Sequence, residues 1–313
     1  MRAILPQPNL LIVGAPKSGT TSLLMWLRSH PGVYHPWFGA GPDAVESGFL
    51  IAGPTDIPIS PSRPRGTLLL PHDTDVDRYK GEPWVIDKSP QHLYSRRALE
   101  TVRDLMPDAK VIIALRDPYD LLISQYMQMW KGVNFDTPFE ELYDKMQSQG
   151  WEANTEIAET WAFLTYPRYS EFVRAWVSEL GSDRVRVVRL ASIAGNASGV
   201  LREISEWLEI SPSKMPNNPT ARNTRGKLSN SPIRKFLREP PKWVFTSARL
   251  LLPSRSARKA LLDPIRRRGW KHVPADKPEI PPEMESEIRA RLKEDTEFFE
   301  ALDSHLPSGT MIG

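Results

Sequence analysis

The segment from Gly14 to Ser22 reads GAPKSGTTS and combines residue types that bind phosphate or sulfate groups. It follows a short apolar run and precedes a helical pattern. Backbone N–H groups of a glycine-bearing turn and the positive end of a helix dipole would therefore converge on one point. Lys17 adds a full charge, and further hydroxyl donors come from Ser18, Thr20, Thr21 and Ser22. The segment predicts an anion site, with a lysine in a surface turn as the alternative.

A second charged segment, RDPYDLLISQY, runs from Arg116 to Tyr126 and follows the apolar run KVIIAL. An arginine at the carboxyl end of a parallel strand faces the crevice in which open α/β sheets bind ligands. Pro118 suits the first position of a helix, and Ser124 would lie in that helix and share an anion with Arg116. The pattern predicts a second anion site, and a salt bridge at the strand end is the alternative.

The elements that must position these two segments alternate between strands and helices. Apolar runs predict strands over 9–13, 84–86, 110–115 and 184–189. Helical spacing predicts a helix from Thr20 that stops at Pro31, and further helices over 93–106, 119–130, 138–146, 169–180, 200–208 and 281–302. Residues 36–83 and 211–232 are predicted to be irregular. The alternation favours an α/β fold with a central, mostly parallel sheet flanked by helices.

Composition is that of a globular protein, with 313 residues of which 40% are hydrophobic and 25% charged. We expect a core over residues 1–210 that carries both anion segments, and a loop, a basic helical extension and a C-terminal helix over 211–313 that pack on the same domain. The absence of cysteine excludes disulfides, thiolate metal sites and a cysteine nucleophile. No apolar run approaches the roughly 20 residues that cross a bilayer, and the first residues lack signal-peptide form, so a cytoplasmic location is expected.

Both anion segments resemble the donor site of sulfotransferases that use 3′-phosphoadenosine-5′-phosphosulfate (PAPS). The order KSGTT resembles their 5′-phosphosulfate loop, and the pattern RDPxxxxxS resembles their 3′-phosphate site. The resemblance covers roughly residues 9–210 and is closer to the bacterial and heparan-sulfotransferase-like branch than to the cytosolic phenol or steroid enzymes. It implies a P-loop-like sulfotransferase architecture, PAPS as cosubstrate, 3′-phosphoadenosine-5′-phosphate (PAP) as product, and no metal requirement.

The resemblance also assigns individual residues to the donor. The implied donor-binding residues are Pro16, Lys17, Ser18, Gly19, Thr20, Thr21, Ser22, Arg116, Ser124, Arg225 and Gly226. Arg225 and Gly226 belong to a basic, glycine-containing segment that would close over the nucleotide.

Two further segments resemble catalytic segments of the heparan-type branch. VESGFL resembles a KExxFF-like segment whose glutamate is the general base, which assigns that role to Glu46 and keeps His35 in reserve. DKSP, from Asp87 to Pro90, resembles an EKTP segment, which implies that Lys88, with Lys17, stabilises developing negative charge. The alternatives are a solvent-exposed glutamate, a polar loop histidine, and a strand-end lysine paired with a carboxylate.

The implied reaction is in-line transfer of a sulfuryl group from PAPS to a hydroxyl of a small metabolite, a lipid or a glycan. One alternative is a nucleotide kinase or another phosphotransferase, whose GxxxxGK[ST] loop carries its lysine after the second glycine rather than before it. Another is a non-catalytic module that binds anionic glycan through the basic residues from Arg222 onward. That region is also a candidate for peripheral membrane contact, with a solvated helical face as the plainer interpretation. No nucleic-acid partner is expected.

Overall fold

The computed structural model of the protein describes residues 7–36, 46, 48, 50, 79–129, 137–149, 165–217, 219, 227–228, 272–273 and 277–302. Its strands are β1 (Leu10–Gly14), β2 (Val33–Tyr34), β3 (Trp84–Lys88), β4 (Lys110–Leu115), β5 (Val185–Arg189), β6 (Lys227–Leu228) and β7 (His272–Val273). Its α-helices are α1 (Thr20–Leu27), α2 (Arg96–Leu105), α3 (Pro118–Met129), α4 (Phe139–Gln149), α6 (Ser170–Leu180), α7 (Leu190–Gly195), α8 (Ala197–Trp207), α12 (Pro282–Arg291) and α13 (Lys293–Ala301). The 3₁₀ helices are η3 (Pro90–Tyr94) and η4 (Pro212–Lys214).

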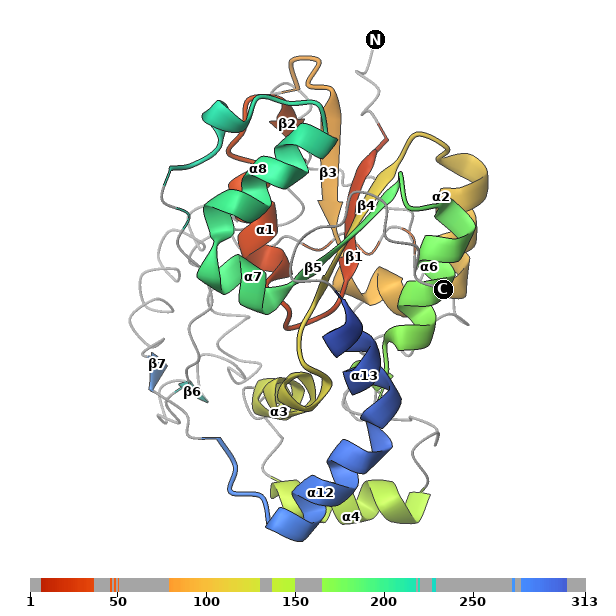
Figure 1. Ribbon diagram of the computed structural model, residues 1–313, viewed down its shortest axis with the longest axis vertical. Coiled ribbons are helices and arrows are strands. Elements are labelled where there is room, and N and C mark those ends of the chain that lie inside the picture. The colour runs from red at the N-terminus through yellow and green to blue at the C-terminus, as the bar shows by residue number, and fades with distance from the viewer. Residues whose placement is uncertain are drawn as a thin grey trace, which may run out of the picture. The chain divides into compact units, whose positions relative to one another are not determined.

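Strands β1 to β5 form one parallel sheet in the order β2-β3-β1-β4-β5 (Figure 1). The chain first builds β2 and β3 on one side of β1, and then builds β4 and β5 on the other side. The strand order therefore reverses between β1 and β4, and the crevice beyond the carboxyl ends of these two strands is the usual ligand site of such sheets. The predicted α/β fold with a central parallel sheet flanked by helices is confirmed.

Both faces of the sheet are covered by helices, which explains why the central strands are continuous apolar runs. In β1, Leu10 and Ile12 pack with α1, α7 and α8, whereas Leu11 and Val13 pack with α2 and α6 on the opposite face (Figure 1). Successive side chains of a strand point to opposite faces, so a strand buried on both sides needs an apolar residue at every position. Every residue of β1 is buried.

Several element boundaries differ from those that the sequence predicts. The helix predicted over 93–106 begins instead as η3 and continues as α2 from Arg96, where the Ser95 hydroxyl caps the helix by accepting from the Ala98 N–H at 3.1 Å. The helix predicted over 281–302 is interrupted at Leu292, between α12 and α13. The predicted irregular stretch 211–232 contains η4 and β6, and β2 and α7 are elements that no periodicity indicated because each is too short.

The chain divides into two units. The first comprises Met1–Tyr126, Thr137–Asn223 and Glu279–Gly313, and it contains the parallel sheet with α12 and α13. The second comprises Met127–Asp136 and Thr224–Pro278, and in it β6 pairs with β7 antiparallel. Among the described residues, no helix combines the length and the apolar character that a membrane span needs.

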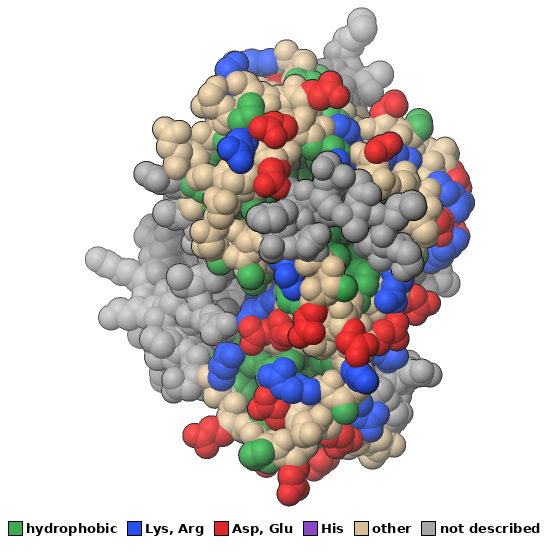
Figure 2. All heavy atoms as spheres, viewed as in Figure 1, with side chains coloured by type: hydrophobic (Ala, Val, Ile, Leu, Met, Phe, Trp, Pro, Cys, Tyr) green, Lys and Arg blue, Asp and Glu red, His purple; other side chains and the backbone are tan. Residues whose placement is uncertain are grey.

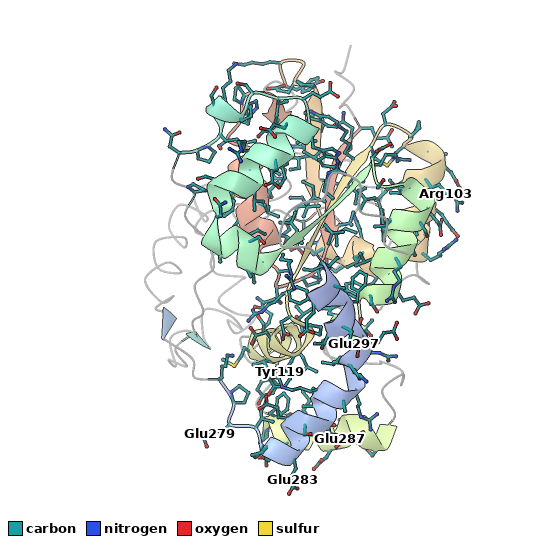
Figure 3. All side chains as sticks on the ribbon, in the orientation of Figure 1. Arg103, Tyr119, Glu279, Glu283, Glu287 and Glu297 are labelled. Atoms are coloured by element: carbon teal, nitrogen blue, oxygen red, sulfur yellow. The ribbon has the colours of Figure 1, made fainter. Side chains whose placement is uncertain are left out.

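Acidic and basic side chains are interspersed over the face of the molecule shown in Figure 2. Helix α12 provides an example, because Arg289 pairs with Glu285 and Arg291 pairs with Glu287 at the i,i+4 spacing of one helix face. Figure 3 labels Glu287 on this helix and Tyr119 at the start of α3. The Arg289 guanidinium lies 4.0 Å from the centroid of the Tyr119 ring, which joins α12 to the helix that follows Arg116.

Candidate active site

The loop that connects β1 to α1 has the backbone of an anion site. Lys17 has a φ of 65° and Gly19 a φ of 85°, so left-handed residues turn the chain just before the first helical N–H groups. In the described part of the chain, no side chain caps the N-terminus of α1. The N–H groups of the first turn have no acceptor within a helix, so an anion at this position would satisfy them.

Two features of the structure favour glycine at position 19. Its positive φ is strained for any residue with a Cβ. A Cβ at this position would also lie 2.8 Å from Cδ1 of Leu190 in α7. A Cβ at position 19 would therefore require the half-buried Leu190 side chain to shift.

The second predicted anion segment begins directly after β4. The Arg116 side chain is 11% exposed and donates from Nη2 to Oδ2 of Asp120 at 2.9 Å, one turn further on. Its Nε is buried, and no described residue accepts a hydrogen bond from it. The Tyr169 hydroxyl donates to the Arg116 carbonyl at 2.8 Å and so fixes the backbone. Arg116 is held in place and keeps donor capacity for an anion, while Ser124 lies half-buried in the second turn of α3.

The two anion segments leave neighbouring strands at the same edge of the sheet. Gly14 at the end of β1 is in register with Ile113 of β4, and the Ala15 N–H donates to the Ala114 carbonyl at 2.6 Å. Adjacent strands lie about 4.8 Å apart, so the chain enters both segments side by side. This is the arrangement that a single ligand with an anionic group at each end requires.

Glu46, Lys88 and Thr21 come together beside the first loop. The Lys88 Nζ lies 2.7 Å from Oε1 of Glu46 and donates to the Thr21 hydroxyl in α1 at 3.3 Å. Lys88 is almost completely buried, with 2% of its side chain exposed, whereas 28% of the Glu46 side chain is exposed. A buried ammonium needs a charged partner, and Glu46 provides one. This contact is compatible with the role that the resemblance implies for Lys88, which is to stabilise developing negative charge. It is also compatible with the alternative, a lysine at a strand end that pairs with a carboxylate.

The segment around Glu46 is held by the residues that follow β3. The Ser89 hydroxyl accepts from the Gly48 N–H at 2.9 Å, and the Gln91 amide donates to Oε2 of Glu46 at 3.3 Å. Leu50 is buried in the same core cluster as Leu93. No local pattern in the sequence indicates these roles for Ser89 and Gln91, because their contacts with Gly48 and Glu46 span 41 and 45 residues.

Two histidines near this segment are neutral at pH 7. Burial, followed by the charges of Arg28 and Lys88, lowers the pKa of His35 to about 4. Burial also lowers the pKa of His92 to about 3, against an opposing hydrogen bond to the Gly48 backbone. His92 lies in η3, with Nδ1 3.9 Å from Oδ2 of Asp87. A weakly basic His35 beside two cations is poorly matched to proton transfer near pH 7, which favours Glu46 as the base.

The remaining predicted donor residues are placed as follows. Pro16, Ser18, Thr20 and Ser22 are buried in the first loop and in α1. Arg225 and Gly226 lie outside the described residues.

Comparison with known proteins gives a family match over residues 71–213, to the model described as "Sulfotransferase family". Heparan sulfate glucosamine 3-O-sulfotransferase 3B1 of Mus musculus is 23% identical over 216 residues, which are 65% of this chain and 46% of that protein. Heparan sulfate glucosamine 3-O-sulfotransferase 3A1 of Homo sapiens is 24% identical over 216 residues, which are 65% of this chain and 44% of that protein. The chain thus spans less than half the length of these curated relatives.

A solved structure, that of a sulfotransferase from Alicyclobacillus acidocaldarius, is similar to this chain with a TM-score of 0.60 and 22% identity. The similarity covers 97% of this chain and 98% of the other. At this level of identity the similarity concerns the fold, which the two chains share.

Proposed function

Because this chain belongs to the sulfotransferase family, we propose that it transfers a sulfuryl group from PAPS to a hydroxyl of an acceptor molecule. The observation that carries the proposal is the position of the two anion segments, which leave adjacent parallel strands at one edge of the sheet. PAPS has a phosphosulfate at its 5′ end and a phosphate at its 3′ end. A donor bound across the two segments would place its sulfur near Lys88 and Glu46.

The first loop would bind the 5′-phosphosulfate, and the second segment would bind the 3′-phosphate. The N–H groups at the start of α1 and the Lys17 ammonium would hold the 5′ group. The buried Nε of Arg116 would donate to the 3′-phosphate, together with the Ser124 hydroxyl. Because Asp120 and the Tyr169 hydroxyl already hold Arg116, little conformational entropy would be lost on binding.

The reaction would be an in-line displacement at sulfur. The acceptor oxygen forms a bond to sulfur while the bond from sulfur to the bridging phosphate oxygen breaks, and PAP leaves with that electron pair. Glu46 takes the acceptor proton. General-base catalysis of this kind raises the rate by roughly 10²- to 10⁴-fold. The Lys88 and Lys17 ammonium groups stabilise the charge that develops on the bridging and sulfuryl oxygens.

A sugar hydroxyl is the first acceptor to test. The relatives named above act, by their names, on a glucosamine of heparan sulfate, although they are much longer than this chain. Small metabolites and lipids remain in the test, because the basic region that follows Arg222 lies almost entirely outside the described residues.

The experiment incubates the purified full chain with PAPS labelled at sulfur and with either heparan sulfate, a metabolite extract or a lipid extract. We expect label in one acceptor pool, and loss of labelling in Lys17→Ala, Arg116→Ala and Glu46→Gln. Matched surface controls are Lys293→Ala, Arg202→Ala and Glu206→Gln, whose side chains are 75%, 66% and 62% exposed. Transfer of phosphate from ATP without transfer of sulfur would contradict the proposal and favour a kinase.

A further inference from the structure

We propose that Gln91 is a positioning residue that fixes the orientation of the Glu46 carboxylate for proton transfer. The inference rests on the proposed function, in which Glu46 is the base. It adds a residue that neither the family resemblance nor the two anion segments indicates.

The geometry gives each oxygen of Glu46 its own donor. Lys88 Nζ donates to Oε1 at 2.7 Å, and Gln91 Nε2 donates to Oε2 at 3.3 Å. The terminal torsion of a glutamate is broad, so an ammonium at one oxygen does not by itself fix the carboxylate plane. A second donor at the other oxygen restrains that rotation. A general base needs such restraint because its lone pair must meet the acceptor proton within hydrogen-bond reach.

Both donors come from one rigid stretch of chain. Lys88 is the last residue of β3, and Gln91 is the second residue of η3. The stretch is anchored on both sides of Gln91, because Ser89 and His92 are fully buried and the His92 N–H donates to the Ser89 carbonyl at 2.9 Å.

The backbone just beyond Gln91 is fixed as well. The Trp176 indole of α6 donates to the Leu93 carbonyl at 2.9 Å, and both side chains are buried. Gln91 therefore extends from a backbone that is held by the core on the α6 face of the sheet.

Residues 88–92 also hold the backbone of the segment that contains Glu46. The Gly48 N–H donates to the Ser89 hydroxyl at 2.9 Å, two residues after Glu46. The main chain and the side chain of this segment are thus fixed to the same five residues, 88–92. A neutral amide is suited to the second position, since it restrains the carboxylate without adding the charge of a second cation.

The test uses Gln91→Met, which keeps the length of the side chain but removes the donor, and Gln91→His, which restores a neutral N–H donor. Gln147→Met is the matched control. Gln147 lies in α4 rather than in residues 88–92, and its amide also donates a hydrogen bond, at 2.9 Å to the Tyr143 hydroxyl of the same helix. Crystal structures of the full chain would report the orientation of the Glu46 carboxylate, and release of PAP from PAPS would report turnover to any hydroxyl.

In Gln91→Met we expect the Glu46 carboxylate to rotate or to adopt two orientations, and kcat to fall about tenfold with the Kd for PAP unchanged. Gln91→His should recover the orientation and at least part of kcat, and the control should match the unmodified protein in both measurements. An unchanged Glu46 orientation in Gln91→Met would overturn the proposal, as would a kcat within twofold of the unmodified value.

The crystallographic readout does not depend on turnover. If Glu46→Gln releases PAP as fast as the unmodified chain, the base assignment of the proposed function has failed, and that result is separate from the orientation seen in Gln91→Met.

Discussion

The Lys88 ammonium lies 2.7 Å from a carboxylate oxygen of Glu46, across 42 residues of sequence. Lys88 ends β3 and also donates to Thr21 in the first turn of α1, so its charge lies at the positive end of that helix. The helix dipole opposes a cation at this position, and burial opposes it further. Glu46 offsets both effects, and an incoming anion would be attracted to the same place.

The first prediction concerns the unequal burial of this pair. Glu46→Ala leaves a buried ammonium without its carboxylate, and we expect it to lower the free energy of unfolding by about 2–4 kcal/mol. Lys88→Met leaves a carboxylate that is partly exposed to water, so it should cost less than about 1.5 kcal/mol. Urea denaturation of both variants measures the difference.

The double variant Glu46→Ala/Lys88→Met tests the cause of that difference. It should be more stable than Glu46→Ala alone, because no unpaired buried charge remains. Additive effects of the two substitutions would show that the ion pair does not couple them.

The second prediction concerns the close approach of α7 to the first loop. Gly19→Ala introduces both strain at a φ of 85° and a contact of 2.8 Å with Leu190. We expect a loss of about 2–3 kcal/mol in the free energy of unfolding and weaker binding of PAP. Leu190→Ala in the Gly19→Ala background should relieve the contact but keep the strain of about 1–2 kcal/mol. Full recovery of stability in the double variant would show that the backbone conformation costs nothing.

The third prediction concerns Arg116 and the two phosphates of PAP. Titration calorimetry of the unmodified chain should show a clear preference for PAP over adenosine 5′-monophosphate, which lacks the 3′-phosphate. Arg116→Met should weaken PAP binding by roughly 10- to 150-fold, the range of one charge-assisted hydrogen bond, and leave monophosphate binding almost unchanged. An equal loss for both nucleotides would place Arg116 away from the 3′-phosphate.

The fourth prediction concerns stability in mild acid. The pKa of His35 falls from 6.5 to about 4 on folding, and that of His92 falls from 6.5 to about 3. Between pH 6.5 and 4 the unfolded chain therefore binds more protons than the folded chain, so stability is full above pH 6.5 and decreases as the pH falls. From pH 7.5 to 5.5 each histidine should cost about 1.4 kcal/mol.

Urea denaturation across that pH range measures the loss, and His35→Asn and His92→Asn should each remove one histidine's share of it. An unchanged pH dependence in both variants would contradict burial of these rings in the neutral form.

The local features of the two anion segments could be read from the sequence because they depend on neighbouring residues. The apolar run of β1 followed by a glycine loop and a hydroxyl-rich segment predicts a strand, a turn and a helix. The hydroxyl-rich start also suggests a side-chain cap, but the described residues provide none at α1. The run KVIIAL followed by Arg116 and Pro118 likewise predicts a strand end beside a helix start, and β4 has the predicted bounds, 110–115. Periodicity and turn chemistry are short-range properties, so they can be recognised without knowledge of the fold.

Other features required the tertiary structure. The sequence could not show that Gln91 reaches Glu46, that Tyr169 holds the Arg116 carbonyl, or that Lys88 is buried, because these depend on contacts across 45, 53 and 42 residues. Such contacts are decided by the order β2-β3-β1-β4-β5, which places the ends of β3, β1 and β4 next to one another. Strand order results from the packing of helices on both faces of the sheet, and no local pattern encodes it. The sequence thus determined the chemical groups, and the strand order decided which of them meet.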